Sequence, residues 1–392
     1  MPRRLLTFLA AAPLLGLPGL CGCGSSFFQS NTTAPGCSSF FHSPSCDSSG
    51  GSGGGTGASN YAFVVNSGGS TVSGLGITTA GALAALSGSP ISITSSPPTA
   101  AAVTRNNSFL YVGNASQIFG YAISSAGALT ALNGGSALAT VNVTDMQVTP
   151  DGKWLMVLDS TGAAIDLFAI NSTTGALASA NGVNFTFPAT GTVPYHLSIN
   201  PAGTAVAATL GLGGQILWSF NSSNGGFTEL SRTAAVNALT ADRGLAWDQS
   251  GNYLFLTRTG TSQGLIVESV AANGALTPTT TAVYSTGGTP TSVALDNTGK
   301  YVYVTNQADS TITGYAIGTN EALTPIAGSP FSSGIGATSI GMDSTGKWVL
   351  VASTGGSPDL TLYGFDASNP GRLYVVSSTS TGLNANFVAL SH

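Results

Sequence analysis

The sequence contains very little charge. Only 6% of its 392 residues are Asp, Glu, Lys or Arg, against about 25% in an ordinary soluble domain. The formal net charge is −5, and no stripe of Lys and Arg occurs along the chain. Nucleic-acid binding and the attachment of a basic helix to a membrane surface both need clustered cations, so the sequence predicts neither.

Long apolar runs and helical periodicity are also scarce. The apolar run at residues 5–20 is broken by Pro13 and Pro18 and is shorter than the about 20 residues of a membrane-spanning helix. No segment shows a 3.6-residue apolar period between capping residues. The chain is instead rich in Gly, with 53 residues, and its β-branched residues recur in short bursts. This pattern is typical of an all-β protein with many short strands and Gly-rich turns.

From about residue 59 the chain repeats itself. One marker is an apolar residue that follows a small-residue turn and recurs every 46 to 50 residues: Leu83, Leu129, Leu177, Phe227, Leu276, Leu323 and Leu373. Each copy has room for four strands, which is the period of a propeller blade. In one copy we expect strands at residues 291–295, 301–306, 310–317 and 323–330. The sequence therefore predicts a seven-bladed β-propeller of four-stranded blades over residues 59–392.

The two ends of the repeat region complete one blade. Residues 61–66 correspond to a second strand with no first strand before it, and residues 386–390 correspond to a first strand with none after it. Pairing of these two segments would remove the open sheet edges of a repeat array. We therefore expect the C-terminal strand to close the ring in the N-terminal blade.

The aspartates that recur between the first and second strands have two interpretations. Asp151, Asp248, Asp296 and Asp343 each precede a glycine in this turn. An aspartate in such a turn commonly accepts hydrogen bonds from its own backbone. A calcium loop would need a ligand spacing that is absent here, so we expect turn capping and no metal or cofactor.

The strand motifs resemble those of a known family. Residues 62–66, 110–114 and 301–306 are similar to the Tyr-Val-Thr-Asn repeat, and residues 311–317 and 323–330 extend the likeness. Together they resemble the lactonase-type seven-bladed propellers, which include 6-phosphogluconolactonase. The resemblance covers residues 59–392 and is specific for the fold, because the motifs are structural.

The resemblance implies candidate catalytic residues. His196, within Val193 to Pro201, matches the histidine of the family, and Arg243 matches an arginine. Thr257-Arg258 replaces an Asn-Glu pair, and Asn306-Gln307 replaces an Asn-Arg pair, so the expected carboxylate and one cation are missing. His196 could act as a general base, with Arg243 and Arg258 as an oxyanion cradle if they reach the same mouth. A lone histidine on a propeller loop is more often a hydrogen-bonded structural residue.

The N-terminus predicts export. Arg3 and Arg4 precede the apolar run, and this arrangement is typical of a signal peptide over residues 1–22. Leu20-Cys21-Gly22-Cys23 resembles a bacterial lipobox, which implies that Cys23 carries the lipid. An ordinary cleaved signal is the alternative. Residues 23–58 form a Gly/Ser-rich tether, in which Cys37 and Cys46 either pair as a disulfide or remain free thiols.

These features favour a binding or interaction module in the cell envelope, lipid-anchored to a membrane and monomeric. We expect its site to be an eroded lactonase-like site and its partner to be an uncharged small molecule, a glycan or an envelope protein. The alternatives are a lactone hydrolase that uses His196 as its base, and a purely structural spacer between envelope partners.

Overall fold

The computed structural model describes residues 60–186 and 192–392. Within these ranges the chain forms strands and two short 3₁₀ turns, η1 (Asn133–Gly135) and η2 (Thr319–Glu321), with no α-helix. The all-β prediction is confirmed. No helix in these ranges has the length and apolar character to cross a membrane. The predicted signal peptide, the tether, Cys23, Cys37 and Cys46 all lie outside the described residues.

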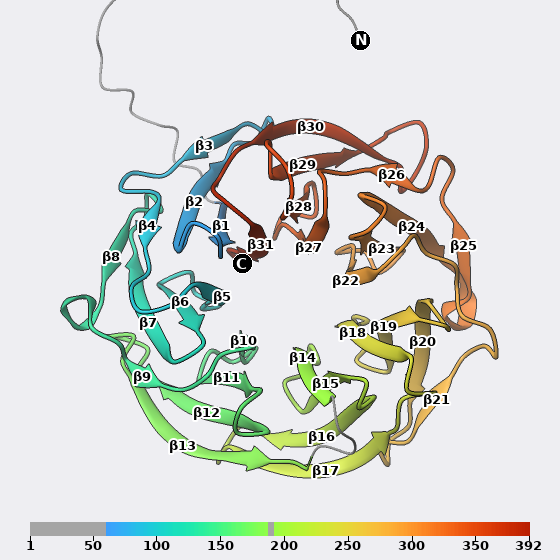
Figure 1. Cartoon of the computed structure of the whole chain (residues 1–392), viewed down its shortest axis with the longest axis horizontal. Helices are drawn as coiled ribbons and strands as arrows, with labels where there is room; N and C mark the ends of the chain where they lie inside the picture. Colours follow the sequence, from blue (N-terminus) through green and yellow to red (C-terminus); the bar gives the residue numbers. More distant parts are fainter. Residues whose placement is uncertain (1–59, 187–191) are drawn as a thin grey trace, which may run out of the picture. The chain divides into compact units, whose positions relative to one another are not determined.

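The strands form seven antiparallel blades arranged in a ring (Figure 1). Blades 4 and 5 are joined in one sheet, because Gly211 of β15 (Ala205–Gly211) pairs with Asp242 of β18 (Thr240–Trp247). In each blade the order runs from an innermost strand at the centre to an outermost strand at the rim. The blades, from the innermost strand outward, are blade 1, β31 (Ala385–Leu390), β1 (Tyr61–Asn66), β2 (Thr71–Ile77) and β3 (Leu83–Ala85); blade 2, β5 (Pro98–Val103), β6 (Phe109–Asn114), β7 (Gln117–Ile123) and β8 (Leu129–Ala131); blade 3, β10 (Asp145–Val148), β11 (Trp154–Asp159), β12 (Ala164–Ile170) and β13 (Leu177–Asn184); blade 4, β14 (Thr192–Ile199), β15 (Ala205–Gly211), β16 (Gln215–Asn221) and β17 (Gly226–Thr233); blade 5, β18 (Thr240–Trp247), β19 (Tyr253–Gly260), β20 (Gly264–Val270) and β21 (Leu276–Pro278); blade 6, β22 (Pro290–Leu295), β23 (Tyr301–Asn306), β24 (Thr311–Ile317) and β25 (Leu323–Pro325); and blade 7, β27 (Ala337–Met342), β28 (Val349–Ser353), β29 (Leu360–Phe365) and β30 (Leu373–Thr379).

Three two-residue strands each pair antiparallel with the third strand of their blade: β4 (Ile91–Ser92) with β2, β9 (Ala139–Thr140) with β7 and β26 (Phe331–Ser332) with β24. In blade 6 the first three strands agree with the prediction to within a residue. The predicted strand at 323–330 is too long, because only Leu323–Pro325 pairs with β24. Gly328, with φ of +84°, then turns the chain away from the sheet, since this left-handed conformation cannot continue a strand.

The two ends of the repeat region close the ring as predicted. β31 pairs with β1 in antiparallel register, with Ala62 opposite Leu390 and Val64 opposite Val388. Strands from the two ends therefore complete blade 1, and the ring has no open edge there.

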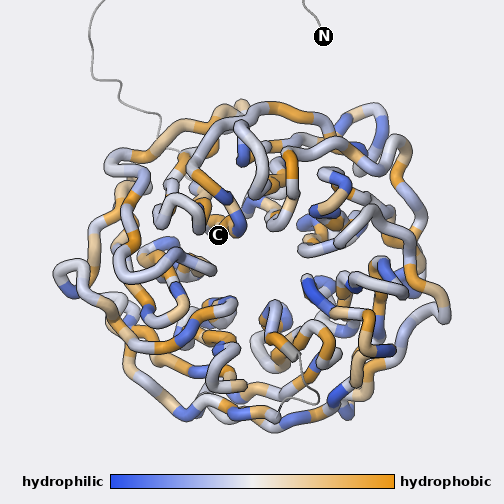
Figure 2. Tube along the Cα trace, viewed as in Figure 1, coloured by the Kyte–Doolittle hydropathy of each residue, from blue (hydrophilic) through white to orange (hydrophobic). Residues whose placement is uncertain are grey.

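Apolar side chains fill the spaces between neighbouring blades. In β1, Phe63 and Val65 face a cluster shared with blade 2, whereas Ala62 and Val64 face a cluster shared with blade 7. Seven such clusters follow one another around the ring, and Figure 2 shows apolar residues recurring along the strands. Both faces of a middle strand are thus buried, which explains why these strands are apolar at nearly every position.

Hairpin turns between the first and second strands of the blades lie on one face of the ring, which we call the turn face. There Asp296 Oδ1 accepts the backbone N–H groups of Lys300 and Tyr301 at 2.8 and 2.7 Å, and Asp248 does the same for Asn252 and Tyr253. These aspartates cap their own turns, as expected. The opposite face, where the chain leads into each innermost strand, is called the start face.

Candidate functional site

The seven innermost strands enclose a central channel. β5, β10, β14, β18, β22, β27 and β31 contact one another in that order around the ring. Two cavities lie along the channel, one of about 250 Å³ toward the start face and one of about 460 Å³ toward the turn face. His196, Ser292, Ser339 and Phe387 line both cavities, so they mark the level at which the two meet.

Side chains of neighbouring blades form hydrogen bonds with the backbone groups along the inner edge of this ring. An innermost strand has a sheet partner mainly on its outer side, so its other edge presents backbone groups that need partners. These groups are reached by side chains of the preceding blade: Thr99 Oγ1 donates to Val143 O at 2.5 Å, Thr291 Oγ1 to Ala337 O at 3.3 Å and Thr338 Oγ1 to Ala385 O at 3.4 Å, while Ser339 Oγ accepts from Val388 N at 3.2 Å.

His196 occupies the same strand position as Ser339 but belongs to blade 4. Its Nδ1 lies 2.9 Å from Oδ2 of Asp145 in blade 3, and 25% of its side chain is exposed. The buried Asp145 carboxylate also accepts the N–H groups of Leu197 at 2.8 Å and Met146 at 2.9 Å. The carboxylate therefore links blades 3 and 4 and fixes the orientation of the imidazole.

The surroundings of His196 favour its charged form. Burial lowers the pKa of His196, but the charge and hydrogen bond of Asp145 and a backbone hydrogen bond to Leu245 together raise it above its ordinary value. The Asp145 carboxylate thus stabilises a charged imidazole, and the contact between the two side chains ties blades 3 and 4 together.

Arg243 lies one blade further on and contacts Tyr195. Its Nη1 donates to the Tyr195 hydroxyl at 2.7 Å, and its guanidinium carbon is 4.7 Å from the centroid of the Tyr195 ring. Tyr195 is 40% exposed and lines the start-face cavity. Nε of Arg243 is buried and has no partner among the described residues. The tyrosine therefore holds the arginine beside the mouth of the channel.

Comparison with family models matches residues 41–194 and 190–385 to the model described as Lactonase, 7-bladed beta-propeller. The chain belongs to this lactonase propeller family. No curated protein matches the chain.

Solved structures share the fold of this lactonase-family propeller at low identity. A protein from Lactobacillus plantarum is 19% identical, with a TM-score of 0.69 over 85% of this chain and 99% of its own. The periplasmic gluconolactonase of Pseudomonas aeruginosa is 16% identical, with a TM-score of 0.68 over 85% and 99%. A protein from Bacteroides uniformis, described as a candidate 6-phosphogluconolactonase, is 16% identical, with a TM-score of 0.70 over the same shares. At such identities the likeness concerns the fold.

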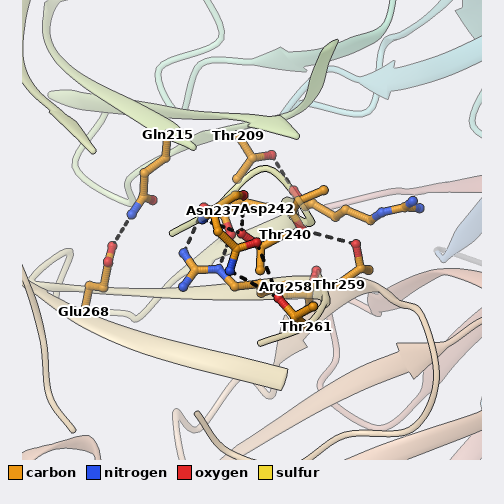
Figure 3. Close-up of polar contacts among 12 residues, drawn as sticks. Thr209, Gln215, Asn237, Thr240, Asp242, Arg258, Thr259, Thr261 and Glu268 are labelled. Carbon is orange, nitrogen blue, oxygen red and sulfur yellow. Dashed lines mark hydrogen bonds and ion pairs between the residues drawn. The ribbon is translucent and has the colours of Figure 1, made fainter. Parts of the chain in front are cut away.

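Arg258 does not join Arg243 at the channel. Figure 3 shows its guanidinium directed at Asp242, with Nε 2.5 Å from Oδ1 and Nη2 3.0 Å from Oδ2. Both side chains are almost fully buried. Asp242 and Arg258 are cross-strand partners within blade 5, so the ion pair forms inside the blade. The cradle of two arginines considered from the sequence is therefore not formed.

At the substituted family positions, the side chains take other roles. Thr257 Oγ1 accepts the N–H of Gly244 at 2.7 Å, and Gln307 lines the start-face cavity. No group of three or more His, Cys, Asp or Glu within residues 60–186 and 192–392 is arranged to hold a metal ion.

Two residues of this site, Asp145 and Tyr195, were not predicted from the sequence. Asp145 brings a carboxylate to His196, at a position where blades 6 and 7 have Ser292 and Ser339. A charged residue at this position, which is also small in blade 2 (Ala100) and blade 5 (Gly244), was the signal available. Tyr195 likewise replaces the threonine that several blades have at its position.

Proposed function

We propose that this lactonase-family propeller is an exported, membrane-anchored binding module whose start-face mouth takes an uncharged ligand and whose lactonase-like site is eroded. The observation that carries this proposal is the pairing of Arg258 with Asp242 inside blade 5, which leaves Arg243, held by Tyr195, as the one arginine of the expected cradle beside the mouth. Lactone hydrolysis needs donors or cations directed at the developing oxyanion, and the cradle of two arginines is not formed.

The mouth itself favours an uncharged ligand. The charges of Asp145 and His196 offset each other, and Arg243 is held by Tyr195. The remaining lining of the start-face cavity is mainly hydroxyl and amide side chains: Thr99, Thr144, Thr291, Ser292, Gln307, Thr338, Ser339 and Asn386. Such a surface offers hydrogen bonds without requiring a counter-charge on the ligand.

Binding is tested by calorimetric titration of the purified chain with glucono-δ-lactone, a neutral sugar lactone, and with gluconate, its anionic counterpart. We expect saturable binding of the lactone, weaker binding of gluconate and loss of lactone binding in Tyr195→Ala. Equal affinity for both compounds, or full lactone binding by Tyr195→Ala, would contradict the proposed ligand class or mouth. Tyr374→Ala is the matched control, because Tyr374 is also exposed but lies on the rim strand β30.

The export and anchor rest on the N-terminal sequence. Arg3, Arg4, the apolar run and Cys23 support a lipid-modified N-terminus followed by a tether. Cell fractionation tests this: Cys23→Ala is expected to move the protein from the membrane fraction to the soluble fraction, whereas Cys37→Ala is expected to leave it in place. Retention of Cys23→Ala in the membrane would count against the anchor.

Lactone hydrolysis is the second candidate, favoured by the 2.9 Å contact between Asp145 and His196 and by the family. In this reaction Nε2 of the neutral imidazole would take a proton from water. The water oxygen would attack the lactone carbonyl carbon, the ring C–O bond would break, and His196 would return the proton to the leaving oxygen. The product is a hydroxy acid.

The hydrolase is tested on a panel of lactones, with His196→Ala and the rim control Tyr374→Ala assayed beside the unchanged chain. Because the raised pKa of His196 must be exceeded to free the base, hydrolysis should increase as pH rises above about 6.5. Turnover that His196→Ala abolishes and Tyr374→Ala retains would favour the enzyme. Absence of turnover across the panel would leave the binding module.

A further inference from the structure

A third cavity lies in blade 5, away from the two cavities of the channel. Its volume is about 490 Å³, and it is lined by Val236, Arg258, Ile266, Pro278 and residues 279–283. None of these residues lines either channel cavity. Its walls come from β19, β20, the end of β21 and the connections before β18 and after β21. The cavity is therefore a separate site from the mouth discussed above.

Hydrogen-bond donors accompany its apolar walls. Arg258 lines the pocket and bonds to Asp242 through Nε and Nη2, so Nη1 stands outside that ion pair. Thr279 Oγ1 is buried and has no hydrogen-bond partner within the described chain. Buried polar groups are normally hydrogen-bonded, and exceptions commonly mark bound water or ligand. The Thr279 hydroxyl, beside the Arg258 guanidinium, therefore points to a molecule that offers a hydrogen-bond acceptor.

The charges around Arg258 exclude a strongly charged occupant. Asp242 already neutralises the guanidinium, and Glu268, bonded to Gln215 (Figure 3), lies on the strand next to Arg258. Burial and the charge of Asp242 raise the pKa of Glu268, although Gln215 and Arg258 act to lower it. An anion would meet no unbalanced positive charge, and a cation would face the guanidinium directly.

We propose that this blade 5 pocket binds a small uncharged amphipathic molecule. Its apolar body packs against Val236, Ile266 and Val283, and a carbonyl or similar acceptor receives hydrogen bonds from Arg258 and Thr279. This proposal does not depend on the function of the channel.

Fluorescence titration of the purified chain with prodan, an uncharged naphthalene ketone, tests the pocket. We expect saturable binding with a blue-shifted emission, and weaker binding of the anionic dye anilinonaphthalene sulfonate. Binding of prodan that does not saturate would overturn the proposal. Tighter binding of the anionic dye would overturn the assigned ligand class.

Variants locate the binding. Val236→Asp places a carboxylate at the apolar rim and should weaken prodan binding at least about tenfold. Val193→Asp is the matched control, because Val193 and Val236 are similarly exposed, at 52% and 59%, and Val193 does not line the pocket. Thr279→Val should weaken binding about threefold to tenfold through the loss of one hydrogen bond. Equal effects of the two aspartate variants, or unchanged binding in Val236→Asp, would overturn the assignment.

Discussion

Two ion pairs in this propeller use the same kinds of group in different ways. Asp242 and Arg258 are cross-strand neighbours within blade 5, whereas Asp145 and His196 come from different blades at the wall of the channel. The first pair is almost fully buried and stabilises one sheet. The second is partly exposed and holds neighbouring sheets in register. The difference shows that His196, at the position expected for a catalytic residue, also forms an ion pair that joins two blades.

The largest loss of stability is expected when the buried pair of Asp242 and Arg258 is broken. Arg258→Met leaves the Asp242 carboxylate buried without its partner, so we expect the free energy of unfolding to fall by about 3–5 kcal/mol. Urea denaturation measures this loss. Arg232→Met is the control, because Arg232 and Glu229 form a more exposed pair and such pairs contribute about 0–1 kcal/mol. Equal losses in the two variants would contradict the distinction.

Breaking the pair of Asp145 and His196 at the channel should cost less stability. Asp145→Asn removes a charged acceptor from His196, and we expect a loss of about 1.5–3 kcal/mol in urea denaturation. The same variant should lower the pKa of His196, measured by NMR titration, because Asp145 is a main cause of its elevation. An unchanged pKa would show that the contact between the two side chains does not persist in solution.

The fold could be predicted from the sequence, whereas the pairing of Asp242 with Arg258 could not. The strand at residues 301–306, the Asp296 turn and the pairing of the chain ends follow from local pattern and repeat counting, which depend on neighbours in sequence or on the period. The partners of Arg258 and His196 depend on register. Asp242 lies opposite Arg258 only because of the pairing of β18 with β19.

Asp145 was harder to foresee for a related reason. It reaches His196 across a blade boundary, through the relative placement of β10 and β14 at the channel. No periodicity along one strand reports that placement. Arg243 was recognised from the family pattern, but its contact with Tyr195 again joins two blades. The sequence thus indicates which residues are unusual, and the inter-blade geometry decides what they contact.

Uncharged hydrogen bonds between blades should contribute less to stability than either ion pair. Thr338→Val removes the hydroxyl that donates to Ala385 O and keeps the shape of the side chain. We expect a loss of about 0.5–1.5 kcal/mol, the usual contribution of one neutral hydrogen bond. Thr130→Val, on the exposed rim of blade 2, should change stability by less. If Thr338→Val lowers the free energy of unfolding as much as Asp145→Asn does, the charge of Asp145 contributes nothing beyond an ordinary hydrogen bond.

The smallest effect is expected from pH at His196. Its folded pKa is raised above the unfolded value of about 6.5, so its contribution to stability is fully present below pH 6.5 and is lost as pH rises through the folded pKa. Neutral His196 can still donate one hydrogen bond to Asp145, and the attraction between the imidazolium and the carboxylate is what the loss of the second proton removes. The urea midpoint of the unchanged chain should therefore decline slightly across this range, relative to His196→Gln, which cannot titrate. A difference between the two chains that stays constant with pH would show that folding does not raise the pKa of His196.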